Sequence, residues 1–297
     1  MRIIKTTIQH ARTPTPRFSN DVPDLVREIG NEFTTHRVDE PVLKAELLVG
    51  HVLGVRRLAL YLDRNRVLDE PELKRVGQGM NRILAGEPIQ YVLGETDFMG
   101  YVYKTDRRAL IPRPETEELV KAVLDCHDVW HGFPSIADVG TGTGCIVITL
   151  AIMHPEGQYL ATDISSDAIE LARENARRLP ITFVQTNLLA RTESESLDAV
   201  VSNPPYVASA TIAGLDPCIR DHEPVSALDG GPSGTEIIAR LVPEAARTLK
   251  PGGRIFLEIG EDQSKVVRSI LRDVGFHKVH VSRDMAGHER IATGVKG

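Results

Sequence analysis

The loop Asn203-Pro204-Pro205-Tyr206 is the most specific chemical signal in the sequence. It follows directly on the apolar run 197–202, which we expect to be a strand. Proline fixes its own φ angle, and Pro205 keeps Pro204 out of the helical region. The Asn203 amide and the Pro204 carbonyl are therefore held in a nearly fixed geometry, from which they could accept the two N–H groups of an amide or exocyclic amino nitrogen.

Such a nitrogen is a weak nucleophile because its lone pair is delocalised, but it can accept a sulfonium methyl while both N–H groups are bonded. The bonds strengthen as positive charge develops, and preorganised polar groups of this kind change rates by about 10²- to 10³-fold each. Tyr206 could stack on the planar target and face the sulfonium, an attraction of about 0.5–2 kcal/mol. The loop predicts methyl transfer to a planar nitrogen, with these catalytic residues: Asn203, Pro204, Pro205 and Tyr206.

A glycine-rich turn at residues 138–144 lies between a strand-like run and an apolar helical run, 145–152. Glycines there let the backbone turn tightly and approach a ligand. The dinucleotide fingerprint would place its third glycine at Cys145, which argues against NAD. About twenty residues on, Asp163 ends the next strand, where a carboxylate can accept both ribose hydroxyls. The cofactor-binding residues predicted here are Gly140, Thr141, Gly142, Thr143, Gly144, Asp163 and, beside the cofactor's reactive end, Asn203.

The elements that must position these residues alternate strand-like runs with amphipathic helices. The runs are 136–139, 158–162, 182–185, 197–202, 254–259 and 277–282. Alternation of this kind predicts a Rossmann-like α/β fold, with a mainly parallel sheet covered on both faces and ligands at the carboxyl ends of the strands.

The chain before this pattern has a different character. Residues 21–87 carry apolar positions at helical spacing and predict a small helical domain; 88–109 predict a hairpin linker, and 110–297 the catalytic domain. Residues 1–20 are basic and rich in threonine. We expect a disordered arm there, with an organelle transit peptide as the alternative.

Composition excludes several classes of protein. The 297 residues suit two domains, and a net charge of −6 argues against stable binding to nucleic acid. No apolar run is long enough to span a membrane, and the three cysteines indicate a reducing compartment. We expect a cytoplasmic monomer.

His127 and His131 lie one helical turn apart, but the chemistry needs no metal and we predict none. The arginines Arg56, Arg57, Arg64 and Arg66 are read as a solvated face, with partner docking as the alternative.

The chain resembles the release-factor glutamine methyltransferase family, of the PrmC/HemK type, over almost its full length after residue 20. The resemblance rests on the motifs at residues 86–94, 110–117, 138–144, 203–206, 223–224, 227–231 and 258–260. It implies a class I methyltransferase fold with a seven-stranded sheet and S-adenosylmethionine as cofactor. It also implies methylation of the glutamine amide in the Gly-Gly-Gln loop of class I peptide chain release factors, with the helical domain holding that partner.

One position departs from the family's pattern. Asn187-Leu188 stands where the family commonly has an acidic and an aromatic residue against the adenine, and we expect Leu188 to supply an apolar wall instead. The Asn-Pro-Pro-Tyr loop is shared with enzymes that methylate DNA amino groups. A DNA or RNA amino-methyltransferase therefore stays the alternative, as does a non-enzymatic binding module.

Overall fold

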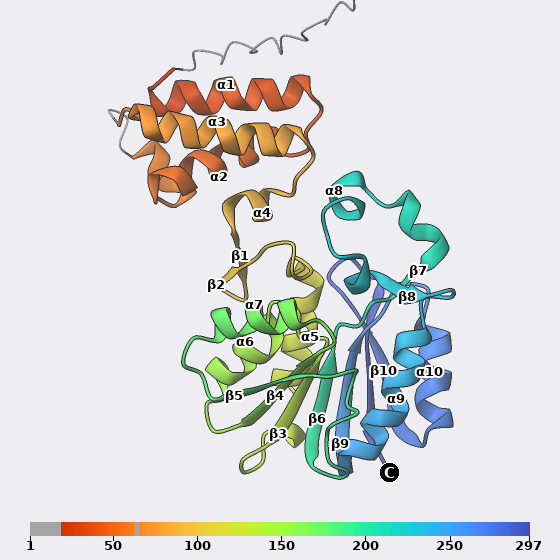
Figure 1. The fold of residues 1–297 in the computed structure, drawn as a ribbon. Coiled ribbons are helices and arrows are strands. Elements are labelled where there is room, and N and C mark those ends of the chain that lie inside the picture. The colour runs from red at the N-terminus through yellow and green to blue at the C-terminus, as the bar shows by residue number, and fades with distance from the viewer. Residues whose placement is uncertain (1–18, 63–65) are drawn as a thin grey trace, which may run out of the picture. The chain divides into compact units, whose positions relative to one another are not determined.

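The computed structural model describes residues 19–62 and 66–297 and divides the chain into two compact units, one ending at Ala85 and the other beginning at Gly86 (Figure 1). The predicted arm, residues 1–20, lies outside the described residues except for its last two positions, and so does Arg64. Each unit is described by itself.

The first unit is a helical bundle. It contains α1 (Val22–Thr35), α2 (Pro41–Leu53), the 3₁₀ helix η1 (Arg57–Tyr61) and α3 (Glu70–Leu84). Asp21 caps α1 by accepting the Asp24 N–H at 3.2 Å, and Asp69 and Glu72 form a reciprocal capping box on α3. The apolar faces enclose a core that includes fully buried Ile29 and Phe33. The N-terminal helical region predicted from the apolar spacing is confirmed.

The second unit is built on a seven-stranded sheet in the order β10-β11-β9-β6-β3-β4-β5 (Figure 1). The five strands from β9 to β5 run parallel, and β11 is antiparallel to both of its neighbours. The bounds are β3 (Ser135–Val139), β4 (Gln158–Asp163), β5 (Ile181–Gln185), β6 (Leu197–Ser202), β9 (Leu249–Glu258), β10 (Phe276–Arg283) and β11 (Glu289–Lys296). The predicted mainly parallel sheet is confirmed.

The strand β11 did not appear among the strand-like runs of the sequence. Its buried positions, among them Ile291, Ala292 and Val295, do not alternate with exposed ones, because the strand lies between β9 and β10 and is covered on both faces. The segment also contains Gly294, which weakens strand propensity. A period-two pattern therefore could not reveal it.

Helices cover both faces of the sheet (Figure 1). On one side are α5 (Pro114–Leu124), α6 (Cys145–Met153) and α7 (Ser166–Ala176); on the other are α9 (Glu236–Thr248) and α10 (Ser264–Asp273). Two hydrophobic clusters result, one under each layer. Helix α6 is buried from Cys145 to Ala151, which explains why its sequence is apolar all round.

The segment predicted as a hairpin linker is part of this second unit. It begins with a short helix, α4 (Ile89–Leu93), followed by the hairpin β1 (Glu95–Phe98) and β2 (Tyr101–Lys104). Phe98 and Tyr103 pack edge to face with ring centroids 6.0 Å apart, in the same cluster as α5 and α6. The Tyr103 hydroxyl lies 2.7 Å from Thr149 Oγ1 on α6, so the hairpin is fixed to the core of the second unit.

A long excursion follows β6. It runs through β7 (Val207–Ala208), η3 (Ser209–Gly214), α8 (Pro217–Arg220) and η4 (Val225–Ala227) and returns as β8 (Asp229–Gly231), which pairs with β7. The pairing needs a glycine at 230, because a Cβ there would lie 2.7 Å from the Pro205 carbonyl oxygen. The return brings residues 224–227 back beside the loop that follows β6.

Candidate active site

A cavity of about 400 Å³ lies at the carboxyl ends of β3, β4 and β6. This is where an open parallel sheet is expected to bind ligands. The predicted site residues that line it are Gly140, Thr141, Gly142, Thr143, Asp163, Leu188, Asn203 and Pro205. Three described residues that we also predicted, Gly144, Pro204 and Tyr206, are outside its lining.

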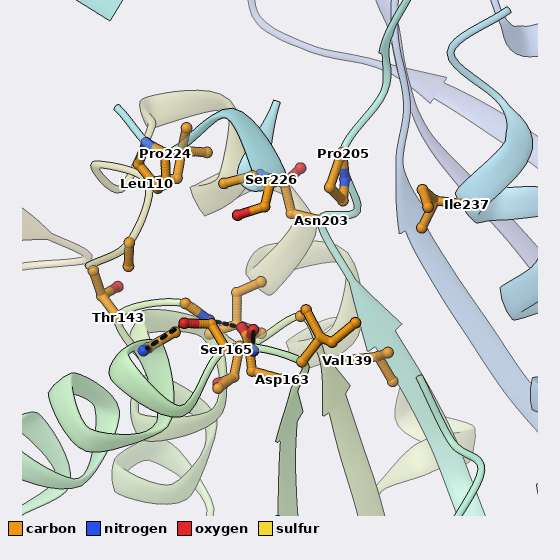
Figure 2. Close-up of a pocket in the computed structure, with 18 of the residues that line it drawn as sticks. Leu110, Val139, Thr143, Asp163, Ser165, Asn203, Pro205, Pro224, Ser226 and Ile237 are labelled. Atoms are coloured by element: carbon orange, nitrogen blue, oxygen red, sulfur yellow. Dashed lines mark hydrogen bonds between the residues drawn. The ribbon is translucent and has the colours of Figure 1, made fainter. Parts of the chain in front are cut away.

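The two ends of the cavity differ in the residues that form them. Figure 2 shows Asp163 and Ser165 at one end, near Thr143, and Asn203, Pro205 and Ser226 at the other. The first end is made from the glycine turn and the end of β4. The second is made from the loop after β6 and the returning segment before β8.

The glycine turn adopts backbone conformations that favour glycine. Gly140, Gly142 and Gly144 have φ angles of +73°, +55° and +82°. Apart from the chain neighbours of Gly140, no described residue comes within 4 Å of the place that a Cβ on it would take, so its backbone is open to a ligand. Gly144 has a different role, because a Cβ there would lie 2.8 Å from Ile148 Cδ1 and 3.1 Å from the Ala172 Cβ. It permits close packing of α6 on α7.

Asp138 supports the turn from beneath. Its Oδ2 accepts the Thr141 hydroxyl at 2.7 Å and the Val147 N–H at 3.3 Å. Asp138 is fully buried, and burial raises the pKa of its carboxyl to about 7. Its Oδ1 is buried without a hydrogen-bond partner within the described part of the chain. The carboxyl therefore ties the turn to the first turn of α6.

Asp163 is held in a fixed orientation at the end of β4. Its Oδ2 accepts the Gly142 N–H at 3.0 Å and its Oδ1 accepts the Ser165 N–H at 2.9 Å (Figure 2). Burial raises the pKa of the carboxyl, and these N–H groups oppose the shift. Because each carboxylate oxygen has two acceptor sites, both can still accept a hydroxyl from a ligand.

Asn187 and Leu188, where the chain departs from the family's pattern, also line the cavity. Leu188 has a φ angle of +50°, and Asn187 Oδ1 accepts a hydrogen bond from the Arg240 guanidinium at 3.0 Å. The open glycine backbone, the Asp163 carboxylate and this apolar wall together fit the nucleoside part of S-adenosylmethionine.

A hydrogen-bond chain lies behind Asn203. Asn203 Nδ2 donates to Thr116 Oγ1 at 2.9 Å, and the Thr116 hydroxyl donates to Glu258 Oε2 at 2.7 Å. The Tyr206 hydroxyl donates to Glu258 Oε1 at 3.2 Å. Glu258 is fully buried, and burial raises the pKa of its carboxyl to about 7. Three elements, α5, β9 and the loop after β6, meet at this chain.

A third buried carboxylate, that of Glu223, joins two segments of the cavity wall. Glu223 accepts the Ile111 N–H at 3.2 Å and forms an ion pair with Arg113. Its side chain is 1% exposed. The Tyr91 hydroxyl donates to the Ala109 carbonyl at 2.8 Å, which anchors the same segment. Glu223 therefore connects the strip 109–113 with the strip 224–227, and both strips line the cavity.

Several residues of this site had no role in the sequence prediction, chiefly Thr116, Glu258, Arg113 and Glu223. They belong to the motifs 110–117, 223–224 and 258–260 that carry the family resemblance. Membership of those motifs was the available signal, but nothing in the sequence connected them with Asn203. The structure joins Thr116 and Glu258, which are 142 positions apart, in one hydrogen-bond chain with Asn203.

Two family models match the chain. Residues 24–94 match the PrmC N-terminal domain, and residues 122–214 match the methyltransferase small domain. The chain is 40% identical to the release factor glutamine methyltransferase of Moorella thermoacetica over 258 residues, which cover 85% of this chain and 90% of that protein. It is 40% identical to the enzyme of the same name from Chlorobaculum tepidum over 279 residues, covering 89% and 93%. A solved methyltransferase structure from Pyrococcus furiosus shares the fold, with 19% identity, a TM-score of 0.51 and coverage of 74% and 98%.

Proposed function

The chain belongs to the release factor glutamine methyltransferase family, and on that premise we propose that it methylates the glutamine side-chain amide in the Gly-Gly-Gln loop of class I peptide chain release factors. S-adenosylmethionine, when bound, supplies the methyl group as a sulfonium. One observation supports the proposal most strongly. Asn203 and Asp163 line the same cavity from its two ends (Figure 2).

The proposed cofactor-binding residues are those at the end of the cavity formed by the glycine turn and the end of β4. Asp163 accepts ribose hydroxyls with the two acceptor sites that the Gly142 and Ser165 N–H groups leave free. The open backbone of Gly140 lets the ligand approach the turn closely. Leu188 supplies an apolar surface for the base.

The proposed catalytic residues act on the target amide and not on the cofactor. The Asn203 Oδ1 and Pro204 carbonyl oxygens accept its two N–H groups, so the amide is oriented and its developing positive charge is stabilised. Pro205 lines the cavity and limits the movement of the loop. Tyr206 anchors the loop through Glu258, and stacking of its ring on the target amide stays a prediction.

We assign recognition of the release factor to the helical region, residues 21–87. The match to the PrmC N-terminal domain and the independent core of this unit support the assignment. Its 3₁₀ helix exposes Leu58 at 79%, and neighbouring Leu62 is 85% exposed, with Arg56 also at the surface. An exposed apolar surface with basic residues at its edge suits a protein partner.

Leu58→Asp tests this role. We expect the KM for the intact release factor to rise, because a charge replaces an apolar contact, while the KM for a short Gly-Gly-Gln peptide stays unchanged. The peptide is the matched control, since it reaches only the cavity. An equal change in both values would contradict the assignment.

We further propose that the protein acts as a cytoplasmic monomer. Its three cysteines are free thiols, which suits a reducing compartment. Among residues 19–62 and 66–297, no helix is long and apolar enough to cross a membrane. The alternative of an organelle transit peptide concerns residues outside the described part of the chain. Sedimentation of the purified protein across a range of concentrations tests the monomer.

Transfer of labelled methyl from S-adenosylmethionine to three substrates in parallel tests the proposed function. The substrates are a class I release factor, the same factor with the Gly-Gly-Gln glutamine replaced, and duplex DNA. We expect label on the intact factor alone. Label on DNA would instead support the alternative amino-methyltransferase, and label on the substituted factor would place the reaction at another side chain.

A further inference from the structure

We infer that Thr116 and Glu258 are positioning residues that fix which end of the Asn203 amide faces the substrate. The inference rests on the proposed function, because it concerns the orientation of the residue to which that function assigns catalysis. It follows from the hydrogen-bond chain behind Asn203 and from the capacity of each member to donate or accept.

The orientation of Asn203 decides whether it helps or hinders. An asparagine amide has an acceptor oxygen and a donor NH₂ group of nearly the same shape. With Oδ1 toward the substrate it accepts an N–H of the target glutamine. Rotated by half a turn, it would direct its own N–H groups at those of the target, and the two would repel.

Thr116 determines that orientation. Its hydroxyl carries one proton, and that proton is donated to Glu258 Oε2 at 2.7 Å. Toward Asn203 the Thr116 oxygen therefore offers only lone pairs, so Asn203 must donate through Nδ2, as it does at 2.9 Å. The Oδ1 atom is left for the cavity, whose lining includes both Asn203 and Thr116.

Glu258 in turn determines the direction of the Thr116 hydroxyl. An ionised carboxylate only accepts, and Glu258 accepts from Thr116 at one oxygen and from Tyr206 at the other. Its position follows from the sheet. Leu257 on β9 pairs with Ser202, the last residue of the parallel strand β6, so Glu258 at the end of β9 lies beside Asn203, which directly follows β6. Thr116, in the first turn of α5, completes the chain.

The titratable and charged groups that act on Glu258 come from four neighbouring elements. They are Glu115 on α5, Cys145 on α6, Tyr206 after β6 and Arg290 on β11. Burial is the largest effect and favours the protonated form, while Arg290 favours the carboxylate and Glu115 disfavours it. Protonation would let Glu258 donate to Thr116, and Thr116 could then donate to Asn203 Oδ1. The amide would turn its NH₂ group toward the cavity.

The cost of burying this carboxylate argues against a purely structural role. Burial of Glu258 disfavours its charged form, and no basic side chain in the described residues forms a salt bridge with it. A neutral side chain of similar size would fill the same space at a lower desolvation cost. What the carboxylate provides is an acceptor that cannot donate.

Removal of the Thr116 hydroxyl tests the inference. We expect Thr116→Val to lower kcat for the release factor by about 10- to 100-fold, because the Asn203 amide loses the bond that holds it and presents Oδ1 to the target in only a small fraction of its orientations. The Kd of S-adenosylmethionine should stay within about twofold. Thr116→Ser keeps the hydroxyl and should restore kcat. Thr149→Val is the matched control: Thr149 is equally buried, its hydroxyl has a side-chain partner at 2.7 Å, and it is outside the cavity lining, so kcat should be unchanged.

Glu258→Gln provides a second measurement that does not depend on the stability of the threonine variants. In the wild type we expect kcat to fall as the pH drops through about 7, where Glu258 takes up its proton. A glutamine side chain in its place cannot ionise, so the variant should lose this acid limb. A full acid limb in the variant would overturn the inference, and so would equal losses of kcat in Thr116→Val and Thr116→Ser.

Asn203→Ala, measured in parallel, separates this inference from the proposed function. If Asn203→Ala loses turnover and Thr116→Val retains it, the positioning role is wrong while the catalytic role of Asn203 stands. If both variants turn over like the wild type, the catalytic role of Asn203 is itself wrong.

Discussion

The two ends of the cavity are built by different means. The cofactor end, as we name the end that we assign to S-adenosylmethionine, is formed by the turn from Asp138 to Gly144 and by Asp163 at the end of the next strand. These supply backbone turns and one carboxylate. The chemical end, as we name the end lined by Asn203 and Pro205, depends on a hydrogen-bond chain. The Asn203 amide donates to the side chain at position 116, which donates to the side chain at position 258. With the proposed roles, cofactor binding depends on local backbone geometry, whereas catalysis depends on contacts between residues far apart in the sequence.

Asn203→Ala should have the largest effect and should be confined to the chemical end. Loss of the amide oxygen removes one acceptor for the charge that develops on the target nitrogen, so kcat should fall by about 10²- to 10³-fold. Single-turnover kinetics would measure the loss, and calorimetry should show cofactor affinity within about twofold of the wild type. A large loss of cofactor affinity would mean that the two ends are not separable.

Asp163→Ala should mainly weaken cofactor binding, the property that Asn203→Ala should leave unchanged. It removes the acceptors that we assign to the ribose, as well as the partners of the Gly142 and Ser165 N–H groups. Charge-assisted bonds of this kind contribute about 1.5–3 kcal/mol, so the Kd of S-adenosylmethionine should rise by about 10- to 100-fold. Calorimetric titration measures it. Unchanged affinity would remove Asp163 from the cofactor site.

Glu258→Gln should change stability in a direction set by pH. The folded-state pKa of Glu258 is raised by burial to about 7, above the value of 4.5 for an exposed glutamate. A raised carboxyl pKa favours the folded state at low pH, and that contribution is lost as the pH rises through about 7. The wild type should therefore lose stability relative to the variant between about pH 4.5 and 7, on the order of 2 kcal/mol, and the difference should level off above pH 7. Urea unfolding at several pH values measures the difference, and a parallel pH dependence in both proteins would contradict it.

Leu188→Phe should have the smallest effect and would sharpen the account of the cofactor end. An aromatic ring on the adenine contributes about 0.5–1.5 kcal/mol beyond its burial, so the Kd of S-adenosylmethionine should fall by roughly 2- to 10-fold. The effect should appear in cofactor titration and leave kcat at saturation unchanged. Weaker binding would show that Leu188 does not face the base, or that its φ angle of +50° does not tolerate the ring.

What the sequence could predict follows the same division. The glycine turn, Asp163 and the Asn-Pro-Pro-Tyr loop are local motifs that follow strand-like runs, and the mainly parallel sheet follows from the alternation of those runs. The strand β11 was missed because burial on both faces removes the alternating pattern. The link between Thr116, Asn203 and Glu258 was missed because it depends on the neighbouring ends of β6 and β9 and on the entry of α5, which no local pattern records.

The roles of Gly144 and Tyr206 show the limit of motif reasoning within the site. Both residues belong to motifs that reach the cavity, yet Gly144 packs against α7 and the Tyr206 hydroxyl is bound to Glu258. A motif specifies a backbone path, and side chains or glycine faces along that path point in different directions. Only the packed structure separates residues that line the cavity from residues that hold the lining ones.

The most direct test of the central claim is tandem mass spectrometry of a class I release factor incubated with S-adenosylmethionine and this protein, or with its Asn203→Ala variant. We predict one added methyl group on the side-chain amide of the Gly-Gly-Gln glutamine with the wild type, and at most a trace with the variant. A methyl group at another residue, or equal methylation by both proteins, would contradict the claim that the Asn203 amide directs transfer to that glutamine.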